Sequence, residues 1–301
     1  MKVICAVDGS EYSQWAVDAL GVLAGHPIES VCLLHSVEPR LPKTAGAPSP
    51  ARMARVVRAL DERGKGLLRT MSQRASLALG QGGTGTRTTV ETALAHGRPA
   101  SSLVSQAQRR RADLLIVGSR GLSDIRGFLL GSVSRHVSVH APCPTLIVKR
   151  PVKSLGQVVL AVDASKHSRA ACDFLCKYVL DEGLRVSVVS VAGHRLTEMA
   201  SHVLPATEVQ QLIQPQVDRA EALVASMRTR VLPVGCAVTT DVLVGHPSEA
   251  ILSHAEKVHA DLIVVGSRGL EGTERLQLGS VAESVLKYAP CSVLIVRRRA
   301  A

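Results

Sequence analysis

The chain has 301 residues, a length that matches about two domains of ordinary size. Hydrophobic residues make up 46% of it, which excludes a disordered chain and is ample for buried cores. The net charge of +11 favours anionic partners, but aromatic residues are only 2% of the chain, so platforms for stacking single-stranded nucleic acid are scarce.

Membrane and secretory signals are not recognisable in the sequence. No apolar run approaches the roughly 20 residues of a membrane-spanning helix. The start, MKVICAVDGS, lacks the long apolar stretch and small-residue cleavage site of a secretory signal, and it is typical of a first buried strand. We therefore expect a cytoplasmic location.

The seven cysteines do not indicate a disulfide framework in a chain of this length. Those in apolar segments are expected to act as small hydrophobic residues, namely Cys5, Cys32, Cys143 and Cys291. Two pairs stand four positions apart on expected helices, Cys172 with Cys176 and His136 with His140. Neither pair has a third ligand at a recognisable spacing, so no metal site is expected.

Short apolar runs and amphipathic stretches alternate along the first half. The apolar runs predict strands at residues 4–8, 31–37, 88–94, 114–119 and 145–149, and the amphipathic stretches predict helices at residues 12–23, 53–78, 99–110 and 130–140. Continuous aliphatic runs are typical of a parallel sheet covered on both faces. Ser10 or Ser13 suits the N-cap of the first helix, and Pro99 suits the first turn of the third.

The second half repeats the first. VICAVDGSEYSQWAVDAL aligns with VVLAVDASKHSRAACDFL, and HAPCPTLIVKR aligns with YAPCSVLIVRR. Asp8 and Asp163 stand 155 positions apart, whereas equivalent residues later in the two copies stand 148 apart. The first copy therefore has about seven extra residues, which we expect within 38–52 or in GQGGTGT. Ser165 or Ser168 and Pro247 repeat the helix-start signals of the first copy.

The repeat predicts two tandem domains, at residues 1–150 and 156–299, joined by PVKSLG. The alternation of strands and helices predicts that each is an α/β, doubly wound, Rossmann-like domain with a five-stranded parallel sheet. Such sheets bind ligands at the carboxyl ends of strands, where the winding direction reverses. Asp8 ends the first strand and Gly118 the fourth, so we expect them to face one crevice.

The most informative motif is GSRGLSDIRGFLLGS at residues 118–132, which recurs as GSRGLEGTERLQLGS at residues 266–280. Its first two glycines leave room for a phosphate against the main chain and permit the positive φ of a tight turn. Its final Gly-Ser pair is expected to open a helix whose N–H groups and dipole attract phosphate oxygens. Arg120 and Arg268 are placed to screen phosphate charge, and Asp8 and Asp163 to accept from an adenine amino group or ribose hydroxyls.

These residues resemble the universal stress protein family, with two such domains covering nearly the whole chain. Nucleotide-binding members carry Gly-x2-Gly-x9-Gly followed by Ser or Thr, with an Asp at the end of the first strand, and both copies match. The resemblance implies ATP in each copy, with Mg²⁺ held by its phosphates. The implied nucleotide-binding residues are Val7, Asp8, Ser36, Val117, Gly118, Arg120, Gly121, Gly131, Ser132 and Val133 in the first copy, and Val162, Asp163, Val191, Val265, Gly266, Arg268, Gly269, Gly279, Ser280 and Val281 in the second.

One position departs from the family pattern. The apolar residue expected after the second strand is Val191 in the second copy but Ser36 in the first, which predicts a looser first adenine pocket. A shift of one residue in the alignment, to Val37, would remove the difference. We expect the second site to bind more tightly.

Three functions are compared: an ATP-binding regulator of a stress response without dedicated catalysis, a slow ATP hydrolase, and a basic nucleic-acid-associated stress protein. Hydrolysis needs a general base or an equivalent charge near the γ-phosphate. Asp124 aligns with Gly272 and Glu274 with Arg126, so no carboxylate is shared and no catalytic residue is expected. The runs at 109–111 and 297–299 are interpreted as a solvated helix end and a basic tail.

The last strand of each copy, in PTLIVK and SVLIVR, would expose an apolar edge if unpaired. Pairing the two edges makes the chain an internal pseudo-dimer. The resemblance implies the same, because single-domain members dimerise through this strand. Further homodimerisation is compatible with the sequence, which identifies neither the stress nor any protein partner.

Overall fold

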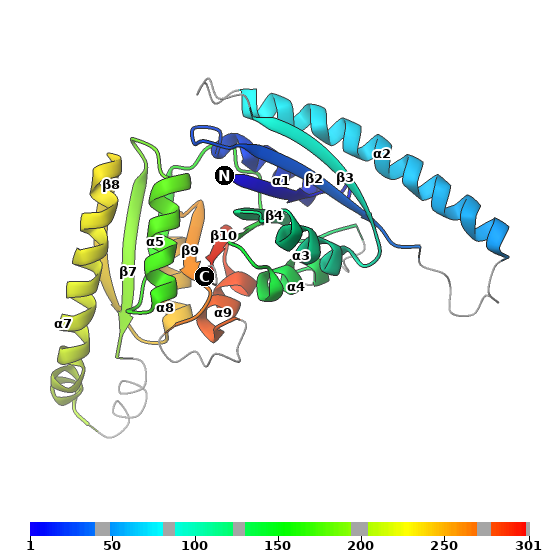
Figure 1. Cartoon of the computed structure of the whole chain (residues 1–301). Coiled ribbons are helices and arrows are strands. Elements are labelled where there is room, and N and C mark those ends of the chain that lie inside the picture. Colours follow the sequence, from blue (N-terminus) through cyan, green and yellow to red (C-terminus); the bar gives the residue numbers. More distant parts are fainter. Residues whose placement is uncertain (40–48, 81–87, 123–129, 194–203, 270–277, 299–301) are drawn as a thin grey trace. The chain divides into compact units, whose positions relative to one another are not determined.

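The computed structural model describes residues 1–39, 49–80, 88–122, 130–193, 204–269 and 278–298. The chain divides into two compact units, Met1–Lys153 and Ser154–Ala301. This division falls inside the PVKSLG segment. Each unit is a sheet with helices beside it (Figure 1).

The first unit has a doubly wound parallel sheet. Its elements are β1 (Lys2–Ala6), α1 (Glu11–Val22), β2 (Ser30–Val37), α2 (Pro50–Gly80), β3 (Thr89–His96), α3 (Pro99–Arg109), β4 (Leu114–Gly118), α4 (Ser132–His140) and β5 (Thr145–Val148). The strand order is β3-β2-β1-β4-β5. Helices α1 and α2 lie together on one face of the sheet, and α3 and α4 lie together on the other (Figure 1). The predicted fold class is therefore confirmed for this unit.

The second unit has the same topology. Its elements are β6 (Gln157–Ala161), α5 (Lys166–Tyr178), β7 (Arg185–Ala192), α7 (Ala206–Val231), the 3-10 turn η1 (Leu232–Val234), β8 (Ala237–Val244), α8 (Pro247–Lys257), β9 (Leu262–Gly266), α9 (Ser280–Tyr288) and β10 (Ser292–Val296). Its parallel strands follow the order β8-β7-β6-β9-β10. The pairing of the two units into an internal pseudo-dimer stays a prediction.

Local sequence explains where these elements begin. The central strand β1 is apolar from Val3 to Ala6 because both faces are covered there, and Val3 and Ile4 are each only 1% exposed. The hydroxyl of Ser10 accepts a hydrogen bond from the Ser13 amide and that of Ser165 from the Ser168 amide, so Ser10 and Ser165 are the N-caps. All four cysteines expected in apolar segments are buried.

The second helix is longer in the first copy: α2 has 31 residues and α7 has 26, with the 3-10 turn η1 following α7 directly. The segments in which the sequence places the extra residues lie largely outside the described residues, at 40–48 and 81–87. Within the described part of the chain, no helix is both long enough and apolar enough to cross a membrane.

The first glycine of each repeated motif is required by helix packing. A Cβ on Gly118 would lie 2.7 Å from the carbonyl carbon of Tyr12 in α1, and one on Gly266 would lie 2.9 Å from the carbonyl carbon of His167 in α5. Neither glycine has a positive φ. The expectation that a tight turn demands glycine here is therefore wrong, and the close approach of the preceding helix is the reason.

We expect Gly118→Ala to lower the free energy of unfolding of the first unit by about 1–3 kcal/mol, because backbone atoms of α1 must move to admit the methyl group. Urea unfolding followed by the fluorescence of Trp15, the single tryptophan of the chain, measures this unit.

The matched control is Gly66→Ala in α2, where a Cβ meets no atom within 4 Å. It should raise the free energy of unfolding by about 0.5–1 kcal/mol, since alanine restricts the unfolded chain. Equal effects of the two substitutions would show that α1 does not restrict position 118.

Candidate functional site

The carboxyl ends of the central strands bring the repeated motif to the first aspartate. Strand β1 pairs with β4 from Val3↔Leu114 to Cys5↔Ile116. Asp8, just past the end of β1, therefore lies beside the loop that leaves β4 at Gly118. Strands β6 and β9 place Asp163 beside Gly266 in the same way. This is the position where the winding of each sheet reverses.

Asp8 is held by hydrogen bonds on both of its oxygens. Its Oδ1 accepts from the amide of Ser10 at 2.9 Å and from the hydroxyl of Ser10 at 2.6 Å. Its Oδ2 accepts from the amide of Leu122 at 3.1 Å. In the second unit, Asp163 Oδ1 accepts from the amide of Ser165 at 3.1 Å. The aspartate thus fixes the strand-end turn and, in the first unit, the glycine loop, while a carboxylate keeps lone pairs for further donors.

The second glycine of the motif is the residue that meets this aspartate. A Cβ on Gly121 would lie 2.6 Å from Asp8 Oδ2, and one on Gly269 would lie 2.8 Å from Asp163 Oδ2. Any larger residue would displace the carboxylate. In both copies, therefore, the aspartate at the strand end requires glycine at this position of the motif.

The Gly-Ser pairs open helices, as the sequence predicted. Gly131 is the N-cap of α4 and Gly279 the N-cap of α9, and both first turns lack a side-chain cap among the described residues. The amide of Gly131 donates to the Ser119 carbonyl at 2.8 Å, and the amide of Gly279 donates to the Ser267 carbonyl at 2.8 Å. These bonds hold each helix start against the glycine loop, so the remaining first-turn N–H groups and the positive end of the dipole are available to an anion.

The exposed serines after these glycines, Ser132 and Ser280, stand at the first helical position, followed by the half-buried Val133 and Val281. The four valines implied to lie near adenine are at most 5% exposed, namely Val7, Val117, Val162 and Val265. They form the apolar floor at this edge of each sheet.

The two arginines of the motif differ in their surroundings. Arg120 donates to the Tyr12 hydroxyl at 3.3 Å, with its guanidinium carbon 5.7 Å from the centre of the Tyr12 ring. The second copy has His167 where the first has Tyr12. Burial and the nearby positive charge of Arg268 lower the pKa of His167, so this imidazole is neutral near pH 7. The Nε atom of Arg268 is buried and has no hydrogen-bond partner among the described residues.

Ser36 and Val191 are structurally equivalent, so the departure seen in the sequence is not an alignment shift. They are the seventh residues of β2 and β7, which have equal lengths. Ser36 pairs in register with Ala95, and Val191 pairs with Leu243, at matching positions of the next strand. The Ser36 hydroxyl donates to the Gly97 carbonyl at 2.9 Å, which gives the first site a polar lining at this point.

Two glycines at the same edge of the sheets were missed in the sequence. Gly97 follows β3 and Gly245 follows β8, with φ of +117° and +124°, a conformation that favours glycine. Each stands two residues before the proline that opens the next helix. This repeated Gly-x-Pro spacing is the signal that could have identified them.

The sequence also raised the questions of a catalytic base and of a metal site. The loop residues compared for a catalytic base lie outside the described residues: Asp124, Arg126, Gly272 and Glu274. Among the residues that the structure describes, no group of three or more His, Cys, Asp or Glu side chains is arranged to hold a metal ion. The rings of His136 and His140 stack with centroids 4.1 Å apart.

Comparison with known proteins gives a consistent result. A family model described as the universal stress protein family matches residues 1–149 and again residues 155–297. The universal stress protein Rv2623 of Mycobacterium tuberculosis is 29% identical over 307 residues, covering 99% of this chain and 96% of that protein. The universal stress protein YxiE of Bacillus subtilis is 31% identical over 153 residues, covering 49% of this chain and 98% of that protein.

A solved structure shares the fold across the full length. The crystal structure of a universal stress protein from Archaeoglobus fulgidus covers 99% of this chain and 96% of its own, with a TM-score of 0.70 at 23% identity. The family model matches nearly all of the chain in two consecutive segments. The chain therefore belongs to the universal stress protein family and contains two copies of its domain in tandem.

Proposed function

We propose that the chain binds ATP at both repeated sites and acts as a nucleotide-dependent regulator in a stress response, without dedicated catalysis. The observation that carries this proposal is the pair of helix starts at Gly131 and Gly279. Each leaves first-turn N–H groups without a side-chain cap beside a loop whose glycine meets the strand-end aspartate. This arrangement suits an anion at one end and hydrogen-bond donors of a nucleoside at the other.

The phosphates would lie over the starts of α4 and α9. The N–H groups of the first turn point at this position, and the exposed hydroxyls of Ser132 and Ser280 add further donors. Because no cluster of metal ligands is present among the described residues, Mg²⁺ would be held by the phosphate oxygens.

The nucleoside would lie at the strand ends. Asp8 and Asp163 are carboxylates, which accept the kind of hydrogen bond that ribose hydroxyls or the adenine amino group donate. The buried valines beside them provide an apolar surface for the base. Ser36 makes the first pocket more polar at the position where Val191 is apolar in the second, which supports tighter binding by the second site.

The sharpest test places a carboxylate where a phosphate is proposed. Gly279→Asp should fold normally, because Asp is a favoured N-cap and the nearest atom to the new Cβ, Arg268 Cα, is 3.4 Å away. We expect the affinity of the second site for Mg·ATP to fall at least about tenfold, since the carboxylate takes the free N–H groups and repels phosphate. Isothermal titration calorimetry of the full chain would show the loss of one of two binding events.

Two control variants separate charge from structure. Gly279→Asn adds a neutral cap of the same shape, and Gly66→Asp adds a charge on α2 where no atom lies within 4 Å of the Cβ. The aspartate should weaken binding more than the asparagine, and the α2 variant should bind as the native chain does. No saturable ATP binding by the native chain, or unchanged binding by Gly279→Asp, would contradict the proposal. If the native chain formed ADP over multiple turnovers and Gly279→Asp abolished this activity, the proposal that the chain lacks dedicated catalysis would be overturned.

The difference between the two pockets gives a second test. We expect Val191→Ser to weaken ATP binding at the second site by about three- to tenfold, because the base loses apolar contact equivalent to one or two methyl groups. The first site is silenced with Gly131→Asp so that calorimetry reports the second alone. The control Val56→Ser changes an exposed valine on α2 and should have no effect. If the first site of the native chain bound ATP more tightly than the second, the prediction that the second site is the tighter one would be contradicted.

A further inference from the structure

A cavity of about 340 Å³ opens at the amino ends of the strands in the first unit, at the opposite edge of the sheet from Asp8. Its floor is formed by two rows of residues that share one face of three neighbouring strands. Lys2, Ser30 and Thr89 are aligned across β1, β2 and β3, and the next row on the same face is Ile4, Cys32 and Glu91. The residues after α3, Arg110 and Ala112, form a side wall.

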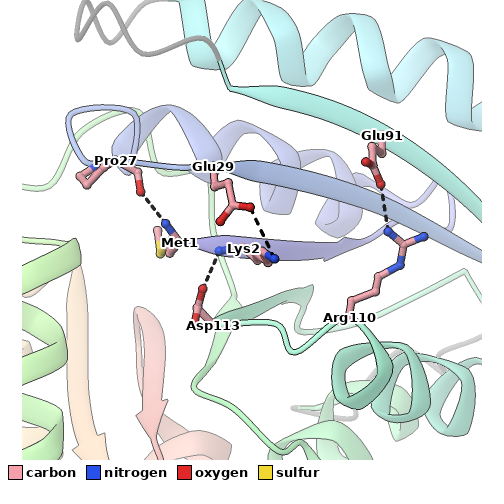
Figure 2. A network of polar contacts seen from close by, with 7 residues as sticks. All are labelled: Met1, Lys2, Pro27, Glu29, Glu91, Arg110 and Asp113. Atoms are coloured by element: carbon pink, nitrogen blue, oxygen red, sulfur yellow. Dashed lines mark hydrogen bonds and ion pairs between the residues drawn. The ribbon is translucent and has the colours of Figure 1, made fainter.

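Two ion pairs lie at the rim of this cavity. Lys2 Nζ lies 3.4 Å from Glu29 Oε1, and Arg110 Nη1 lies 2.9 Å from Glu91 Oε2 (Figure 2). Their side chains are 37% to 66% exposed, so water competes for both pairs and each contributes little to stability. Breaking either pair so that its side chains can contact a ligand therefore requires little free energy.

The charged lining is not part of the repeat. The positions of Lys2, Glu29, Glu91 and Arg110 are occupied in the second unit by Gln157, Leu184, Thr239 and Val258. The position of Ser30 is occupied there by Arg185, whose Nε donates to the Gln157 side chain at 3.2 Å and so lies along the equivalent row. The second unit therefore adopts the same fold without these four charges. Folding of the domain does not require charged residues at these positions.

We propose that this cavity binds a small zwitterion of the α-amino-acid class. Its rim has two positive and two negative groups and no net charge. A lone anion would meet Glu29 and Glu91, and a lone cation would meet Lys2 and Arg110. A ligand with an ammonium and a carboxylate satisfies both signs through charge-assisted hydrogen bonds. The volume lies at the lower end of small-molecule pockets, and Ile4 provides an apolar floor for a side chain.

The test uses the ¹⁵N-labelled full chain and its backbone amide NMR spectrum. Glycine, L-alanine, L-serine, L-leucine and L-methionine are each titrated to about 10 mM, a range that detects millimolar dissociation constants. At least one should shift, saturably, the amides of strands β1 to β3 around the cavity. For that amino acid, the N-acetyl form and the carboxamide form should each bind at least about tenfold more weakly, because each lacks one charge.

Three variants localise the site. Glu91→Gln and Arg110→Gln each remove one charge of the rim and should weaken binding about tenfold. Ser30→Arg places in the cavity the residue that the second unit has at this strand position, so the fold should tolerate it and binding should be lost. The control Arg230→Gln breaks the 2.6 Å pair of Arg230 with Asp173, an ion pair of similar exposure in the second unit, and should leave binding unchanged.

Absence of saturable shifts with all five amino acids would overturn the proposal. Equal binding of the N-acetyl or carboxamide form would also overturn it, because recognition would then not depend on both charges. Retention of native affinity by Ser30→Arg would place the ligand elsewhere. ATP titration of the same variants should match that of the native chain, so a failure here is distinguishable from a failure of the nucleotide proposal.

Discussion

The contact between a strand-end aspartate and a glycine of the neighbouring loop is the constraint on which the candidate site depends. Asp8 and Asp163 each occupy space that a side chain at Gly121 or Gly269 would need. The aspartate also accepts from the turn that begins the next helix. One carboxylate therefore contacts both the turn that begins the next helix and the second glycine of the motif.

The two copies share the framework of the candidate site and still differ around it. The bonds from Gly131 to Ser119 and from Gly279 to Ser267 are equal in length, so both helix starts are held alike. Among the described residues, the copies differ in side chains around this framework, with Tyr12 or His167 beside the motif arginine and Ser36 or Val191 near the end of the second strand. Such differences can alter a site without altering the fold.

The two edges of the first sheet differ in their relation to the repeat. At the carboxyl edge both copies have the same aspartate and motif glycines, whereas the amino edge of the first has four charged groups that the second copy lacks. Opposite charges at half-exposed positions are paired with each other in the structure, so they add little to folding. The amino edge of the domain can therefore differ between the copies while the framework at the carboxyl edge is the same.

The sequence alone determined the fold class, the repeat and the approximate positions of the helices in the first copy, because hydrophobic periodicity and glycine spacing are local properties of the chain. It also predicted that Asp8 faces the glycine loop if the first and fourth strands are neighbours, and the structure established that β1 pairs with β4. It could not determine why Gly118 must be glycine, because the atoms that forbid a Cβ there belong to Tyr12, more than a hundred residues earlier. The ion-paired cavity at the amino edge was likewise decided by tertiary structure, because it depends on distances between segments that the linear pattern does not encode.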